Sequence, residues 1–192
     1  MTIQLEYAGS IKPTKKLVGI LYWANASAYS TLKTSIEDIS ANLEDNAALT
    51  SAGALSTEGI SFAENTEEGE TLPDLNGNIV ESTEGTSAPS ITFQLLQDSE
   101  GARRLVYGNI EVDASGLVTK EYTDENPSPK VLVLHFRKKN IVHRVIIPEA
   151  TFSSRGDKTL VTDALDAQEV TYNITVPHYT IRGTIDEDQE GV

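Results

Sequence analysis

Cysteine is absent from the 192 residues of this chain, and so are long apolar runs. Without cysteine the chain can form no disulfide, bind no metal through a thiolate and use no cysteine nucleophile. The longest mostly apolar stretch, residues 17–24, is much shorter than the roughly 20 residues that span a bilayer. The first residues also lack the basic segment and apolar run of a secretory peptide. We therefore expect a soluble protein made in a cytosol, with no membrane binding.

Basic residues are scarce as well. The chain has 15 Lys and Arg against 29 Asp and Glu, which gives a formal net charge of −14. Such a surface repels nucleic-acid phosphates and so disfavours a conventional DNA-binding role. The acidity has two interpretations that the sequence leaves open: solubility alone, or a surface past which nucleic acid moves without sticking.

Catalytic motifs are missing. There are three histidines, His135, His143 and His178, and they form neither His-x-x-x-His nor His-Glu-x-x-His. No nucleophile elbow, phosphate-binding loop or dinucleotide fingerprint is present. Acid pairs within 64–74 and 186–190 are typical of solvated charge, and the ligand spacing of a calcium loop is absent. The sequence therefore predicts no enzyme, no cofactor and no metal site.

The length fits one domain with appended arms. We expect an extended N-terminal arm at 1–16, a single β-rich domain at 17–183 and an acidic tail at 184–192. Within the domain, residues 63–77 contain several acids and no basic residue, so this segment cannot bury enough apolar surface to pack alone. It is predicted to be a long acidic loop.

Alternating or continuous apolar patterns predict several short strands. They cover 17–23, 53–63 with an interruption at Gly59, 78–84, 90–96, and 170–181, where Pro177 indicates a sheet edge or a bulge. The clearest pattern is a hairpin over 130–147 with a two-residue turn at Lys139-Asn140. In that register three pairs share one face: Phe136 with His143, Leu134 with Val145, and Leu132 with Ile147. His135 and His143 then lie on opposite faces and would not share a metal.

Two short helices are predicted. One lies within 32–43, where the apolar residues have helical spacing and Thr34 or Ser35 would cap it. The other begins at a cap from Asp98 or Ser99 and ends near Gly108. The predicted fold class is therefore mainly β: a β-sandwich or barrel with one or two short helices, a long acidic loop and extended terminal arms.

An ordered series of features over residues 40–180 resembles the major tail (tail tube) proteins of long-tailed bacteriophages of the siphophage type. Residues 53–62 (GALSTEGISF) resemble a strand-turn that in those proteins leads into an acidic loop. A strand like 76–83 (NGNIVEST), a strand like 92–95 (TFQL) and a short helix ending in Tyr107-Gly108 follow. The later hairpin and the strand 171–176 (TYNITV) also fit.

The resemblance implies a structural virion protein with a β-sandwich or barrel core flanked by a helix. Such proteins assemble as hexameric rings that stack into the tail tube, and strands of neighbouring subunits join to line the lumen. The implied partners are further copies of the chain, a tape measure protein and a tail terminator, with non-specific passage of double-stranded DNA. The implied location is the virion tail, after synthesis in the cytoplasm of the bacterial host.

Charge indicates which residues would bridge rings. The candidate contacts pair basic residues of the arm with acidic residues of the loop: Lys12, Lys15, Lys16 with Glu64, Glu67, Glu68, Glu70 and Asp74. The alternatives are another tail or capsid component, such as a tail terminator, a decoration protein or a contractile-system tube, and a ligand-binding β-domain. An aromatic share of 6% gives little material for a ligand-binding cleft.

Overall fold

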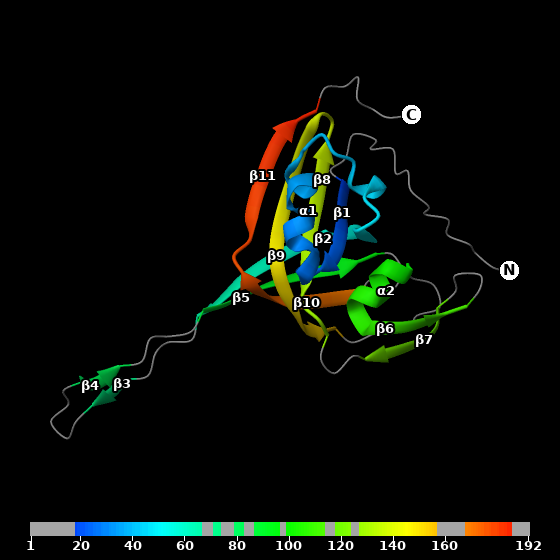
Figure 1. The fold of residues 1–192 in the computed structure, drawn as a ribbon. Helices are drawn as coiled ribbons and strands as arrows, with labels where there is room; N and C mark the ends of the chain where they lie inside the picture. The colour runs from blue at the N-terminus through cyan, green and yellow to red at the C-terminus, as the bar shows by residue number, and fades with distance from the viewer. Residues whose placement is uncertain are drawn as a thin grey trace.

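The computed structural model describes residues 18–66, 71–73, 79–82, 87–96, 99–113, 118–123, 127–156 and 168–185. The protein is mainly β, with a closed barrel of six strands and two short α-helices (Figure 1). The predicted fold class is confirmed. The expected arm at 1–16 lies outside the described residues, and so does the expected tail after residue 185.

The barrel closes through one long strand, β9 (Ile141–Arg155). Around the barrel the order is β1 (Val18–Asn25), β2 (Thr50–Thr66), β5 (Ser87–Leu95), β10 (Gln168–Val176), β9 and β8 (Lys130–Lys138), which returns to β1. All six pairings are antiparallel. The second half of β9 pairs with β10, whereas its first half pairs with β11 (Tyr179–Thr184). β11 therefore lies outside the closed barrel.

Two small hairpins complete the described strands. β3 (Thr71–Pro73) pairs with β4 (Ile79–Ser82), and β6 (Gly108–Val112) pairs with β7 (Val118–Thr123). The β8–β9 hairpin has the predicted register, with Phe136 opposite His143 and Leu134 opposite Val145. Lys139 in its turn has φ 54°, as a two-residue turn with the twist of the flanking strands requires.

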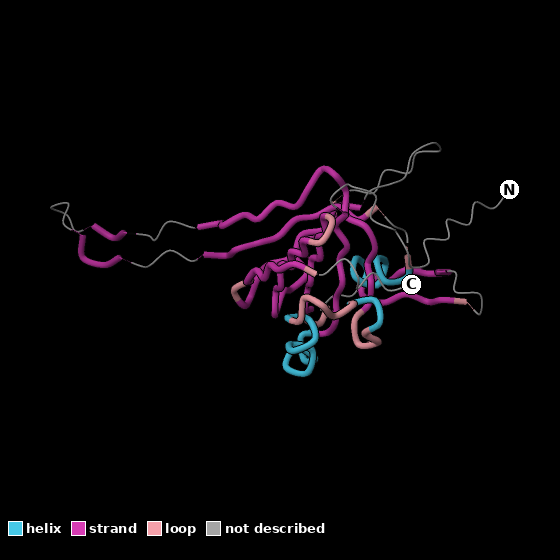
Figure 2. Tube along the Cα trace, turned by 90° about the horizontal axis from the view of Figure 1, so that it is seen from above, coloured by secondary structure: helices cyan, strands magenta, loops and turns pink. Residues whose placement is uncertain are grey.

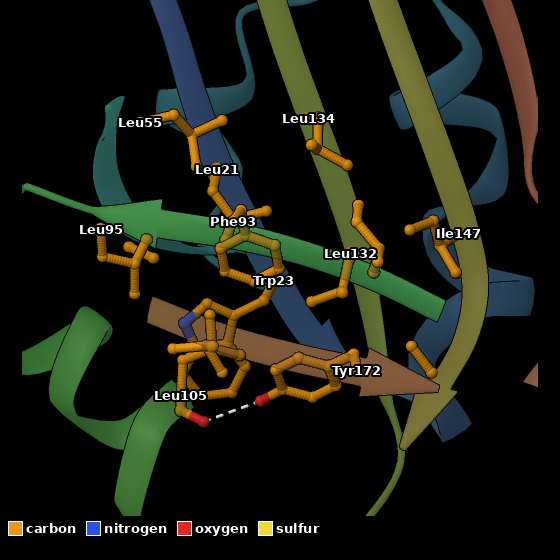
Figure 3. Packing of buried hydrophobic residues seen from close by; sticks show 14 of the residues in the cluster. Leu21, Trp23, Leu55, Phe93, Leu95, Leu105, Leu132, Leu134, Ile147 and Tyr172 are labelled. Atoms are coloured by element: carbon orange, nitrogen blue, oxygen red, sulfur yellow. Dashed lines mark hydrogen bonds between the residues drawn. The ribbon is translucent and has the colours of Figure 1, made fainter. Parts of the chain in front are cut away.

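Both faces of the central strands are buried, which explains the continuous apolar run Val131-Leu132-Val133-Leu134. One set of side chains fills the barrel, where Leu21, Trp23 and Leu132 pack with Phe93 and Tyr172 (Figure 3). The other set lies on the outer face, where α1 (Tyr29–Glu37) covers β1, β8 and β9.

The first helix is shifted from its predicted position. It begins at Tyr29 and ends at Glu37, so neither Thr34 nor Ser35 caps it, although Leu32 and Ile36 are buried. Asp38 has extended backbone angles, and its carboxylate accepts hydrogen bonds from the amide and hydroxyl of Ser40. This local turn competes with further helix. Residue 43, expected in the helix, lies in a 3-10 turn, η2 (Leu43–Asp45); another, η1 (Ala26–Ala28), precedes α1.

The second helix, α2 (Glu100–Tyr107), has the predicted caps. The Ala102 amide donates to Ser99 Oγ at 3.2 Å, and Gly108 ends the helix with φ 81°. Asp98, the alternative cap, lies outside the described residues.

β2 and β5 form a long hairpin that projects well away from the barrel, with β3 and β4 near its far end (Figures 1 and 2). The register of β2 against β5 shifts between Leu55 and Ile60, around the predicted interruption at Gly59. Of the segment 63–77, residues 63–66 continue β2 and 71–73 form β3; 67–70 and 74–77 lie outside the described residues.

The predicted strand 170–181 is two strands. β10 ends at Val176 and β11 begins at Tyr179, because Pro177 cannot donate a backbone hydrogen bond and the chain changes partner there. No helix within the described ranges is long and apolar enough to cross a membrane.

Candidate assembly surfaces

In the seven-stranded sheet, one edge of β11 and part of one edge of β2 have no partner strand within the described part of the chain. β11 pairs with β9 from Tyr179 opposite Ile146 to Thr184 opposite Ile141, and no described strand pairs with its other edge. β1 pairs with β2 only between Thr50 and Ala54, so residues 60–66 of β2 have β5 on one side alone. Unpaired backbone donors and acceptors along such edges are a template for another strand.

One face of β11 packs against α1 on the outside of the barrel. The Tyr179 hydroxyl donates to a Glu37 carboxylate oxygen at 2.7 Å and lies 2.9 Å from the Tyr29 hydroxyl. Burial, together with these two neighbours, raises the pKa of Tyr179 above its usual range. Gly183 lies so close to Ile39 that an added Cβ would meet Ile39 Cδ1 at 2.9 Å. The edge of β11 is therefore backed by the helix and held in place.

The face of β11 that points away from α1 is polar, and a basic cluster lies beside it. Thr180, Arg182 and Thr184 are exposed on β11. Arg182 is opposite His143. Two residues further along β11, Thr184 is opposite Ile141, which is itself opposite Lys138 of β8. Because opposite and alternate residues share a face, Lys138, His143 and Arg182 lie on the same side of the sheet.

We call Lys138, Lys139 and Arg182 the basic end. All three side chains are exposed. Arg137 supports the turn, since its Nε donates to the Lys139 carbonyl at 3.0 Å. Among the described residues no ion pair involves a member of the basic end. Positive charge with no ion-pair partner among the described residues is unusual in a chain of net charge −14 and is available to an acidic partner.

The projecting hairpin carries the opposite charge. Glu64 is exposed on β2, opposite Pro89 of β5. From Glu64 to Glu84 the sequence has seven acidic residues and no basic one. The other residues predicted as contacts lie outside the described ranges: Lys12, Lys15, Lys16, Glu67, Glu68, Glu70 and Asp74. Their predicted pairing therefore stays a prediction.

Phe62 of β2 and Val176 at the end of β10 are exposed apolar side chains. Phe62 is 43% exposed and Val176 is 37% exposed. The Phe62 ring stacks on His178, with 4.8 Å between ring centroids. This contact joins the hairpin to the connection between β10 and β11. The sequence offered no pattern for it, because Phe62 and His178 lie in segments that only the barrel topology brings together.

A buried arginine fixes the end of α1. Arg144 is 1% exposed, and its guanidinium makes five hydrogen bonds. The acceptors are His135 Nδ1 (3.1 Å) and the carbonyls of Ile36 (3.0 Å), Asp38 (2.6 Å), Ile39 (3.3 Å) and Ala41 (2.6 Å). All five N–H donors of the side chain are thus used. The positive charge lies where the carbonyls at the end of a helix favour a cation.

The groups around Arg144 have shifted pKa values. Burial, and then the charges of Arg144 and Arg137, lower the pKa of His135 to about 4, so the imidazole is neutral near pH 7. Burial also lowers the pKa of Arg144, against the opposing effect of Asp38. Burial and the nearby Glu44 carboxylate raise the pKa of Tyr22 above its usual range. Within the described residues no group of three or more His, Asp or Glu side chains could hold a metal ion.

No protein-family model matches the chain, and no curated protein matches it. Among solved structures it is similar to a chain in the tail of an empty GTA particle refined with C6 symmetry (12% identity, TM-score 0.36, 72% of this chain and 90% of that one). It is also similar to a chain of the anti-feeding prophage tube-terminating cap (13% identity, TM-score 0.34, 96% and 100%).

A third similar chain comes from the sheath-tube complex of an extracellular contractile injection system, PVC, in the extended state (12% identity, TM-score 0.33, 94% and 95%). At identities and TM-scores this low, these likenesses carry no argument about function.

Proposed function

We propose that this protein is a structural, non-enzymatic subunit of a phage tail tube, which polymerises as stacked hexameric rings around a lumen for DNA. One observation supports the proposal: among the described residues, the seven-stranded sheet leaves one edge of β11 and one edge of the projecting part of β2 without a partner strand. Long uncovered edges are a liability in a protein that acts as a monomer. They are useful in a protein that joins copies of itself.

The kind of symmetry follows from having two unlike edges. A contact between two different surfaces of the same chain is head-to-tail, so it closes into a ring or continues as a helix. Such rings can stack into a tube. The order of features that resembles the tail tube proteins supports the same conclusion, since α2 ends at Tyr107-Gly108 between β5 and β8, at the place in the chain where the resemblance expects a short helix.

The net charge supports the role of a conduit. Six copies of a chain of charge −14 give 6 × −14 = −84 for each ring. A lumen that shares this charge repels phosphates, so double-stranded DNA passes through without binding. In this proposal the chain is made in the host cytoplasm, functions in the virion tail and meets a tape measure protein and a tail terminator there.

A tail terminator, a decoration protein or a contractile-system tube is the second candidate. A terminator ends a tube, so it would form single rings that do not stack. A ligand-binding β-domain is less well supported, because Trp23, Phe93 and Tyr172 lie buried in the barrel rather than in an open cleft.

The test is the assembly state of the purified full chain over a wide concentration range, followed by sedimentation velocity and negative-stain electron microscopy. We expect rings and tubes of one uniform diameter at high concentration. Single rings that never stack would favour the terminator. A strictly monomeric species at the highest concentration would overturn the proposal.

A further inference from the structure

The edges of β11 and β2 that lack a described partner strand carry opposite charge. β11 carries exposed Arg182, and Lys138 and Lys139 lie in the adjoining hairpin. β2 carries exposed Glu64 at the start of a segment with seven acidic residues and no basic one. Charge of one sign on each edge determines which edges can meet.

We propose that the β2–β5 hairpin of one copy lies along the free edge of β11 of the next copy, with Glu64 beside the basic end of that copy. This inference rests on the proposed function, and it names the surfaces that would form the joint between subunits. The occupant of the β11 edge is thus a second copy of this chain.

Like edges are excluded from pairing with one another. Two β11 edges side by side would bring Arg182 of one copy against Arg182 of the other. Two β2 edges would bring the acidic segments together in the same way. Like charges placed directly opposite each other on paired strands are destabilising, so only the unlike pair is attractive. The charge pattern therefore specifies a head-to-tail contact, which is the kind that closes into rings.

The joint cannot form within one copy. β11 begins beside the base of the hairpin, where His178 stacks on Phe62. From there β11 runs toward the β8–β9 turn, while the hairpin extends away from the barrel (Figure 1). The acidic hairpin and the basic end of the same chain therefore lie at separate ends of the molecule. Only another copy can bring an acidic hairpin to the basic end.

The edge of β11 is prepared for strand addition. The face toward α1 is fixed by the hydrogen bond from Tyr179 to Glu37 and by the close packing of Gly183 on Ile39. The face of β11 away from α1 carries only Thr180, Arg182 and Thr184, so no apolar side chain on it drives unspecific association. A preordered edge loses little conformational entropy when a strand adds to it.

Cross-linking tests the contact directly, because the chain has no cysteine of its own. Full-length Glu64→Cys and Arg182→Cys variants are mixed and treated with a short bifunctional maleimide. We expect covalent heterodimers several-fold above the dimers that either variant gives alone. The Glu64→Cys, Arg182→Cys double variant is expected to give a ladder that stops at the ring size.

The matched control is Lys33→Cys mixed with Glu64→Cys, since Lys33 is exposed on α1 and belongs to neither edge. A second test removes the positive charge: the Lys138→Glu, Arg182→Glu variant should lose rings and tubes at concentrations where wild type and Lys33→Glu form them. Circular dichroism and thermal melting of each variant separate loss of contact from loss of fold.

The outcomes separate this inference from the proposed function. Rings of wild type without cross-links above the control would overturn the inference and leave the function standing. A strictly monomeric wild type without cross-links would overturn both. Cross-links that form only after removal of residues 186–192 would show that the acidic residues after β11 occupy the basic end, which overturns docking by a second copy. Docking by a second copy would also be overturned if the wild type gives no cross-links but binds duplex DNA, and Arg182→Glu abolishes that binding.

Discussion

Arg144 Nε donates a 3.1 Å hydrogen bond to His135 Nδ1, across the β8–β9 pair. The bond requires an imidazole nitrogen that carries no proton. It therefore ties the end of α1, which Arg144 holds through carbonyl groups, to the protonation state of one histidine.

The first prediction is a pH dependence of stability. The pKa of His135 falls from 6.5, the value of an unperturbed histidine, to about 4 in the folded protein, chiefly through burial. A lowered folded-state pKa means that the unfolded chain binds the proton more readily. The contribution of neutral His135 to the free energy of unfolding is therefore full above about pH 6.5. It is lost as pH falls toward 4, and the loss is on the order of 2–3 kcal/mol.

The measurement is urea unfolding at a series of pH values, for wild type and for His135→Gln. Glutamine offers an acceptor oxygen to Arg144 but does not titrate. The variant should have a flatter profile between pH 6.5 and 4. Identical profiles for the two proteins would contradict the prediction.

The second prediction concerns Arg144 itself. Arg144→Ala removes five hydrogen bonds from a buried site and leaves α1 without its C-terminal partner. We expect a loss of at least about 3 kcal/mol in the free energy of unfolding. Arg144→Lys should rescue little, because an ammonium has three donors and no planar fork. The exposed Arg182→Lys serves as the control and should stay within about 0.5 kcal/mol of wild type.

A third prediction concerns the contact between α2 and β2. An added Cβ on Gly101 would lie 2.1 Å from the Ser51 carbonyl oxygen, a backbone atom that cannot move aside easily. The Gly101 carbonyl also accepts a 3.0 Å hydrogen bond from Trp23 Nε1. Gly101→Ala should cost roughly 1–3 kcal/mol.

Trp23 is the one tryptophan of the chain, so its fluorescence reports this contact directly. The emission of Gly101→Ala should shift as the indole loses its fixed acceptor. Glu100→Ala, at an exposed neighbouring position, should leave the emission unchanged. An unshifted spectrum and an unchanged midpoint in Gly101→Ala would rule out the tight approach.

The fourth prediction tests the other end of α2. Tyr172 lies in the barrel, and its hydroxyl donates to the Leu105 carbonyl at 2.7 Å (Figure 3). That carbonyl is among the last four of the helix, which have no partner within it. Tyr172→Phe keeps the ring and leaves the carbonyl unpaired, at a cost of about 1–3 kcal/mol in thermal or urea unfolding. Phe93→Tyr, which adds a hydroxyl nearby, should not restore the loss.

The sequence predicts the fold best where the determinants are local. The β8–β9 register follows from alternation around the Lys139-Asn140 turn, and the caps of α2 follow from Ser99 and Gly108. The two pairings of β9 with β10 and β11 could not be predicted in this way. They join strands far apart in the chain, and Pro177 alone does not show that the partner changes there.

The candidate surfaces show the same limit. The burial of Arg144 in β9 depends on carbonyls at the end of α1 and just after it, more than 100 residues away in sequence, as for Ile36 at a separation of 108. Lys138 and Arg182 come to the same face of the sheet only because β11 pairs with β9. The acidic residues around Glu64 in the sequence are enough to predict it as a contact. They do not predict that it lies in the part of β2 that projects from the barrel.

The packing of Gly183 against Ile39 links two parts of the molecule that differ in chemistry. Ile39 belongs to the short segment whose carbonyl groups Arg144 holds, and Gly183 belongs to the strand that a neighbouring copy would meet. A proton on His135 therefore weakens the support of that strand without touching any group at the joint. On this basis acid would weaken an assembled tube from inside each subunit as well, through the segment that Arg144 holds.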